Sequence, residues 1–319
     1  MKGVSIIICC HNSANRIVDT LKHLWLQETN GLPIEIVLVN NNCTDDTVMI
    51  AMEEWRDCGR HMPLKIVEEP VMGVSAARSK GIRAAKYQYA VFCDDDNWLA
   101  SDYVSLAFDT MESNPKIGVL GGSSTAVSDA AFPDWFEQVK GDYAVGLQLE
   151  GISCDASDRG YLWGAGMVVR KFVFEDMIGN GIANALSDRK GKELSSGGDS
   201  EICKWFLMLG YSLWYNPNMK YAHFIESNRL LEEYYVQMKE KQNEAYLLLQ
   251  FYDYFIDFSQ LSFWERQARY IKAVSKLVLN TRLSADDEKA LCLLCGRKIP
   301  NKEIDAVLMR NLSLILRMK

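Results

Sequence analysis

The chain predicts an α/β fold, with a mainly parallel central sheet flanked by helices and a C-terminal helical extension. Two observations support this. Through the first hundred residues, short apolar runs alternate with segments of helical periodicity, which is the order that builds a parallel sheet covered by helices. After about residue 226, apolar residues recur only at helical spacing.

The first apolar run, 4–10, is rich in Ile and uninterrupted, as expected of a parallel strand that is buried on both faces. Further strands are predicted over 34–39, 64–67 and 89–93. The intervening helices are predicted over 17–24, 44–56 and 74–85. From about residue 117, two glycine-rich strands, 117–123 and 162–169, indicate a second lobe that completes a site. We therefore expect a catalytic domain over 1–225 and a helical region over 226–319.

Composition narrows the class of protein. Hydrophobic residues make up 48% of the 319 residues and charged residues 24%, which is typical of a soluble globular protein. Nine cysteines, several of them inside apolar runs, favour buried free thiols and a reducing, cytoplasmic compartment. The pair Cys292 and Cys295 has no second pair or nearby histidine, so we interpret it as packing. No signal peptide or membrane-spanning run is recognisable, and no nucleic-acid partner is predicted.

Charge is unevenly distributed. Residues 264–319 hold 12 Lys and Arg against 6 Asp and Glu, a net charge of +6, which leaves −13 for residues 1–263. A basic helical tail could make a peripheral contact with the anionic inner face of a membrane. A solvated helical face would give the same pattern, and both interpretations stay open.

The most informative motif is Asp94-Asp95-Asp96, directly after the predicted strand 89–93. Adjacent carboxylates at the mouth of a sheet repel one another unless a cation neutralises them, and Mg²⁺ or Mn²⁺ is the expected ion. In an extended segment Asp94 and Asp96 point to one side and Asp95 to the other. The alternative is an acidic loop that caps a helix starting near Leu99.

Polar side chains also follow the other predicted strands. His11 and Asn12 follow the first strand, Asn40 to Asn42 the second, and Glu68 and Glu69 the third. Ligands of open α/β sheets bind beyond the carboxyl ends of the strands, so these residues predict a binding site at one edge. Simple turn chemistry would also explain Asn40 to Asn42.

Five motifs occur together in a known order. They are VSIIICCHN (4–12), IVLVNNNCTD (36–45), GVSAAR (73–78), FCDDD (92–96) and GDSE (198–201). Together they resemble the inverting family-2 glycosyltransferases of the GT-A fold, over roughly residues 4–225. The resemblance implies a nucleotide-diphosphate sugar donor, with UDP as the expected nucleotide, and a divalent metal.

The resemblance also implies roles for individual residues. Asp199 matches the catalytic base, with Glu201 as the fallback, and the metal ligands would be Asp96, Asp94 and His223. Substrate binding would involve Cys10, His11, Asn12, Asn40, Asn42, Gly73, Arg78, Asp94, Asp95, Trp163, Gly164 and Glu201. The chain departs from the family pattern at Asn40, where aspartate is usual, at Ser79, where asparagine is frequent, and at Gly198, where glutamate is usual.

These features predict an inverting, metal-dependent glycosyltransferase that acts on a hydroxyl of a glycan or lipid-linked glycan in surface-polysaccharide synthesis. Two alternatives stay open. The departures at Asn40 and Gly198 would suit a module that binds a nucleotide sugar or glycan without turnover. A sugar nucleotidyltransferase would use a similar sheet, but the loop 10–16 lacks the glycines expected of one. A P-loop NTPase is excluded because the chain has no GxxxxGK[ST] motif.

Overall fold

The computed structural model describes residues 1–57, 62–186, 196–279, 281–282, 284, 287 and 302–318. Cys292 and Cys295, which we interpreted as packing residues, lie outside these ranges. In the first part the elements are β1 (Val4–Cys10), α1 (Ile17–Trp25), β2 (Ile34–Asn40), α2 (Thr47–Asp57), β3 (Leu64–Glu68), α3 (Val74–Ala84), β4 (Tyr89–Asp94), β5 (Asn97–Leu99), α4 (Tyr103–Ser113) and β6 (Ile117–Val127).

The second part begins with short elements and ends in long helices. In order they are α5 (Phe136–Val139), η1 (Lys140–Tyr143), β7 (Cys154–Asp155), η2 (Ser157–Arg159), β8 (Val168–Arg170), α6 (Lys171–Gly179), α7 (Gly198–Met208), β9 (Ser212–Phe224), η3 (Ser227–Leu230), α8 (Glu232–Gln260), α9 (Phe263–Val278) and α11 (Lys302–Met318).

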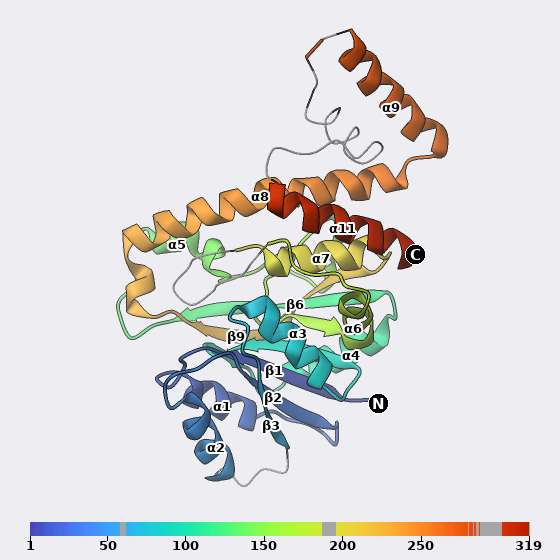
Figure 1. The fold of residues 1–319 in the computed structure, drawn as a ribbon. Coiled ribbons are helices and arrows are strands. Elements are labelled where there is room, and N and C mark those ends of the chain that lie inside the picture. Colours follow the sequence, from blue (N-terminus) through green and yellow to red (C-terminus); the bar gives the residue numbers. More distant parts are fainter. Residues whose placement is uncertain are drawn as a thin grey trace.

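The strands of the described residues form one sheet in the order β3-β2-β1-β4-β8-β6-β9-β5, with β7 also paired to β9. The first four strands are mutually parallel, whereas β8 runs antiparallel to both β4 and β6. The predicted α/β class with a mainly parallel sheet is therefore confirmed (Figure 1). Because β1, β2 and β4 are parallel and in register, their carboxyl ends meet at one edge.

Both faces of the sheet are covered, which explains the uninterrupted apolar run of β1. Ile7 belongs to one core with residues of α3, α6, α7, α8 and α11. Ile6 and Ile8 point to the opposite face and pack with residues of α1, α2 and α4. Helix α3 lies so close to β1 that a Cβ on Gly81 would stand 2.3 Å from Ile7 Cγ2.

Two local expectations differ from the structure. The alternative interpretation of the acidic triplet has a helix starting near Leu99, but residues 97–99 form the short strand β5 paired with β9, and helix α4 begins at Tyr103. The strand expected over 162–169 is limited to β8, because Gly166 adopts φ +71° and interrupts the extended backbone. Helix α7 begins at Gly198, so Asp199 lies in its first turn.

The C-terminal helices belong to the main body of the protein. Phe251 and Tyr252 of α8 and Leu308 and Leu312 of α11 are buried in the same core as Ile7 of β1. Helix α9 is the exception: its buried Ala273 packs with Tyr254 in a small separate cluster. Figure 1 shows α7, α8 and α11 together, with α9 set apart beyond the end of α8. Among the described residues after 226, parts of α8 and α11 therefore share a core with the sheet, whereas α9 lies outside this core.

Leu312→Ala should reduce the free energy of unfolding by about 2–4 kcal/mol, because it opens a cavity in the shared core. Leu316→Ala on the same helix is the control, since that side chain is 52% exposed and its loss should cost under about 0.5 kcal/mol. Urea denaturation followed by circular dichroism measures both. Equal, small effects would contradict the docking of α11.

Candidate active site

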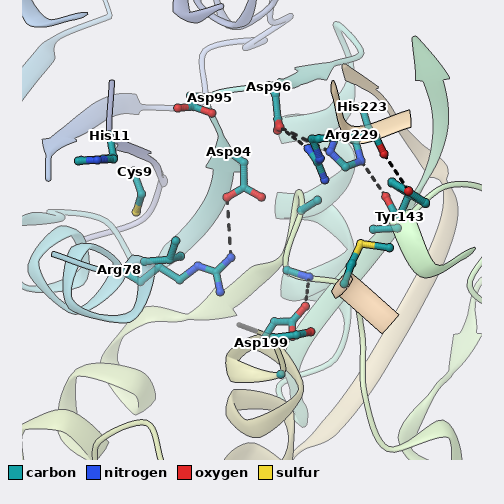
Figure 2. Close-up of a pocket in the computed structure, with 18 of the residues that line it drawn as sticks. Cys9, His11, Arg78, Asp94, Asp95, Asp96, Tyr143, Asp199, His223 and Arg229 are labelled. Carbon is teal, nitrogen blue, oxygen red and sulfur yellow. Dashed lines mark hydrogen bonds and ion pairs between the residues drawn. The ribbon is translucent and has the colours of Figure 1, made fainter. Parts of the chain in front are cut away.

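A cavity of about 330 Å³ lies at the carboxyl ends of β1, β2 and β4. This volume is at the lower end of the range for small-molecule sites. Three parts of the chain line it: the ends of the first strands with the start of α3, the loops around residues 142–144 and 164–165, and the segment from Ser196 to helix α8. Figure 2 shows the principal side chains around it.

Ten of the predicted site residues line this cavity. They are Cys10, His11, Gly73, Arg78, Asp94, Asp95, Asp96, Gly164, Asp199 and His223. The structure thus brings together residues that are up to about two hundred positions apart in the sequence. Five predicted residues do not line it: Asn12, Asn40, Asn42, Trp163 and Glu201.

The acidic triplet lies at the mouth of the sheet. β1 and β4 pair with Cys9 opposite Asp94, so the three aspartates follow at the sheet edge. Asp95 turns away from Asp94 (Figure 2). It accepts two hydrogen bonds from Arg16, from Nε at 2.9 Å and from Nη2 at 3.0 Å. This bidentate pair occupies both oxygens of Asp95. Asp95 is therefore a structural partner of Arg16 in this conformation.

Asp94 faces the interior of the cavity. Its Oδ1 lies 3.8 Å from Nη2 of Arg78, the buried guanidinium at the start of α3. Burial raises the pKa of Asp94 to about 6; Arg78 opposes this rise, and the carboxylates of Asp96 and Asp95 add to it. A cation placed beside Asp94 would relieve this unfavourable charge.

Asp96 is held by two groups that come from distant segments. Arg229 donates from Nη1 to Asp96 Oδ2 at 3.2 Å, and His223 Nε2 lies 3.6 Å from the same oxygen. Burial alone would raise the pKa of Asp96, but His223 and Arg229 hold it well below its usual range. The pairing of β5 with β9 puts Asn97 opposite His223 and so brings Asp96 to this histidine.

Tyr143 orients both of these groups. Its backbone carbonyl lies 2.8 Å from His223 Nδ1, and its hydroxyl donates to the backbone carbonyl of Arg229 at 2.9 Å. This contact orients the imidazole ring so that Nε2 faces Asp96.

Asp199 lies on the other side of the cavity, at the N-terminus of α7. Its Oδ2 accepts a hydrogen bond from the backbone N–H of Gly164 at 2.7 Å, and Oδ1 accepts one from the N–H of Ser200 at 2.7 Å. The helix N-terminus favours a negative charge at this position. A Cβ on Gly164 would lie 2.8 Å from Arg78 Nη2 and 3.0 Å from Asp199 Cβ, so this position has no room for a side chain.

The asparagines outside the cavity brace the loops that follow β1 and β2. Asn40 donates to Glu68 at 2.8 Å and accepts from the N–H of Cys43, and Asn12 accepts from the N–H of Thr44 at 2.8 Å. Asn42 adopts a left-handed backbone with φ +59°. Turn chemistry therefore accounts for the contacts of these residues. Asn41, which belongs to the polar group expected after the second strand, lines the cavity and accepts from the N–H of Gly73 at 2.8 Å.

Trp163 and Glu201 are buried outside the cavity lining. The guanidinium of Arg159 lies over the Trp163 ring, 5.6 Å from its centroid. Glu201 points into the core and accepts from Tyr252 at 2.6 Å and from the N–H groups of Ala185 and Leu186 at 2.9 and 3.0 Å. This position does not support a substrate-binding role for Glu201.

Sequence reasoning missed several residues of the cavity. They are Arg16, Asp142, Tyr143, Glu226 and Arg229, together with Met238, Lys241 and Gln242 of α8. Arg229 and the α8 residues lie beyond the expected domain boundary at 225. The acidic triplet itself was the available signal, because three buried carboxylates require cationic partners from elsewhere in the chain.

A comparison with protein families identifies the chain. A model of glycosyl transferase family 2 matches residues 5–178, more than half of the chain. The chain belongs to this family. This is the family that its motifs resemble.

Individual relatives match shorter segments. EpsH of Bacillus subtilis strain 168 is 32% identical to this chain over 101 residues. These residues are 32% of this chain and 28% of EpsH. The poly-beta-1,6-N-acetyl-D-glucosamine synthase of Staphylococcus epidermidis strain ATCC 35984 is 27% identical over 124 residues, which are 39% of this chain and 29% of that synthase. The matched segment spans less than a third of either relative.

Solved structures share the fold. Residues 1–349 of Staphylococcus aureus TarS superpose with a TM-score of 0.51 at 15% identity, over 99% of this chain and 80% of that one. GalNAc-T7, solved with UDP, GalNAc and Mn²⁺, gives a TM-score of 0.53 at 13% identity, over 70% of this chain and 44% of that one. These likenesses confirm the predicted glycosyltransferase fold. Among the described helices, none has the length and apolar character needed to cross a bilayer.

Glu201 should make the stability of this glycosyltransferase depend on pH. Burial raises the pKa of Glu201 from 4.5 to about 7, although its hydrogen-bond donors oppose the rise. The folded state then binds the proton more tightly than the unfolded state, so the free energy of unfolding should fall as pH rises between these two values. The fall should amount to about 3 kcal/mol at most.

Glu201→Gln removes this titration and should flatten the pH dependence of the free energy of unfolding between about pH 5 and pH 8. Glu233→Gln, at an exposed carboxylate in the first turn of α8, is the control and should leave the slope unchanged. Urea denaturation over this pH range gives the slopes. An unchanged slope in Glu201→Gln would show that Glu201 titrates normally.

Proposed function

We propose that this glycosyltransferase is inverting and metal-dependent, and that it transfers a sugar from a UDP-sugar to a hydroxyl group of a glycan or lipid-linked glycan. One observation carries the proposal. A single cavity holds the acidic edge of Asp94 and Asp96 on one side and the carboxylate of Asp199 on the other, with Gly164 between Asp199 and Arg78. A direct displacement needs these two functions on opposite sides of one sugar carbon.

The donor atoms around Asp96 fit a divalent cation. Asp96 Oδ2 and His223 Nε2 are 3.6 Å apart, and two ligands at about 2.1 Å from one ion can have this separation. The described residues contain no cluster of three or more His, Cys, Asp or Glu side chains that could hold a metal by themselves. Mg²⁺ typically uses one or two carboxylates and completes its shell with water and substrate phosphates.

Asp96, Asp94 and His223 are thus the proposed ligands of Mn²⁺ or Mg²⁺. The bound ion would neutralise charge on the departing nucleoside diphosphate. Arg78, in the second turn of α3, lies beside Asp94, and the backbone N–H groups at the N-terminus of α3 also favour an anion, so Arg78 would contact the same diphosphate. Cys10, His11 and Gly73 line the end of the cavity proposed for the base and ribose.

Asp199 is the proposed base. The N–H of Gly164 and the first turn of α7 fix its carboxylate at the cavity wall, which leaves oxygen lone pairs for the proton of an acceptor hydroxyl. The acceptor oxygen would bond to the anomeric carbon as the bond to the diphosphate breaks, and the proton would pass to Asp199. Attack opposite the leaving group inverts the configuration.

The comparisons support a role in surface-polysaccharide synthesis and UDP as the nucleotide. One relative is named as a polysaccharide synthase, and TarS has been solved with UDP-GlcNAc and with UDP. We place the enzyme in the cytoplasm, where a lipid-linked acceptor would bring it to the inner face of the membrane. The free thiols among the described cysteines suit this compartment.

Isothermal titration with UDP and with GDP, each in Mn²⁺ and in EDTA, tests the donor site. We expect binding of UDP that requires Mn²⁺, and Asp96→Ala should weaken it by at least about tenfold. Asp109→Ala removes an exposed carboxylate of α4 outside the cavity lining and should bind UDP as the wild type does. Metal-independent binding, or an unaffected Asp96→Ala variant, would reject the metal assignment.

Asp199→Asn should lower kcat for sugar transfer by about 10²–10⁴-fold, because asparagine cannot accept the proton. The affinity for UDP with Mn²⁺ should change by less than about twofold, since Asp199 lies on the acceptor side. Release of UDP from a panel of UDP-sugars with glycan acceptors is the assay. Near-normal turnover by this variant would remove Asp199 from the mechanism.

A further inference from the structure

Helix α9 exposes an apolar stripe. Trp264, Ile271, Val278 and Leu279 at and just beyond this helix are 78%, 63%, 77% and 71% exposed. The first three are spaced by seven residues, so they lie on one side of the helix at intervals of about two turns. Large side chains with this much exposure are normally scattered singly, and a row of them on one helix marks an interaction surface.

Basic side chains lie on the polar side of α9. Lys272 and Arg269 are exposed, and at 100° per residue they lie about 100° and 160° around the helix from Ile271, so Lys272 borders the apolar row and Arg269 lies on the far side of the helix. Helix α9 carries four basic residues in total and a single acidic residue, Glu265. An apolar row combined with basic residues on the polar face is the pattern of helices that lie in the interface of a membrane.

Another side of α9 packs on the protein. Ala273 is fully buried and packs with Tyr254 of α8, and Leu261, Tyr270 and Val274 are packed against this pair. These contacts leave the row of Trp264, Ile271 and Val278 exposed. In Figure 1, α9 stands beyond the end of α8 and away from the sheet, so a flat surface could reach it.

We infer that the exposed face of α9 docks on an anionic lipid bilayer. Ile271, Val278 and the Trp264 ring would enter the boundary between headgroups and acyl chains, while Arg269 and Lys272 would contact anionic headgroups. The positive charge of α9 on an otherwise acidic chain is complementary to such a surface. This inference depends on the charge and exposure of α9 and not on the chemistry of the cavity.

Sedimentation with lipid vesicles tests the inference on the 319-residue chain. We expect binding to phosphatidylcholine vesicles that contain about one third phosphatidylglycerol, weaker binding to phosphatidylcholine alone, and a decline as salt is raised. Ile271→Ser with Val278→Ser should lower the partition coefficient roughly tenfold. Arg269→Ser with Lys272→Ser should remove the preference for anionic vesicles by a similar factor.

Met49→Ser with Met52→Ser is the matched control, because these α2 side chains are 52% and 56% exposed and carry no basic border of this kind. This control should sediment like the wild type. Binding of UDP with Mn²⁺, measured on every variant, verifies the fold and tests the cavity separately.

Failure of the wild type to sediment with anionic vesicles would overturn the inference, as would equal losses in the α9 and α2 variants. A lipid-free dimer that dissociates in Ile271→Ser/Val278→Ser would also overturn it, by assigning the face to a second copy of the chain.

Discussion

The mutual repulsion of three adjacent carboxylates is the constraint around which this enzyme is organised. Carboxylates this close at the end of a buried strand are tolerated only when positive charges approach them. The chain supplies those charges from three separate places, and the pairs are Asp95 with Arg16, Asp94 with Arg78 and Asp96 with Arg229. The loop before α1, the N-terminal half of α3 and the segment after β9 therefore lie together at one edge of the sheet. The cavity lies between these three segments.

The region after residue 225 is part of this arrangement. Arg229 reaches back to Asp96, and Tyr143, which orients Arg229 and His223, stacks on Tyr235 of α8 at 6.2 Å between ring centroids. Helix α8 then contributes to the cavity wall and continues into the core that it shares with α7 and α11. The same helix leads into α9. A helical region that could be regarded as an appendage thus connects the reaction site to the outermost surface of the molecule.

Local sequence signals were sufficient for much of this fold. The apolar run of β1 and the aspartates after β4 depend on neighbouring residues and on the register of parallel strands, so they were predicted. Asp199 was found through a family motif. β5 and Arg229 were not predicted, because a three-residue strand carries no periodicity and an arginine some 130 residues away carries no local mark of its partner. The strand expected before β8 failed because glycine conformation overrode an apolar pattern.

Gly164 has one further consequence. The space that a side chain on Gly164 would need is filled by the guanidinium of Arg78 and by Asp199. The region that would receive the leaving group and the region that would deliver the nucleophile are thus separated by the thickness of one peptide segment. The two oxygens that exchange at a sugar carbon are themselves only a few bond lengths apart. In the proposed reaction, the backbone at this position would therefore determine how far apart the two reactants are held.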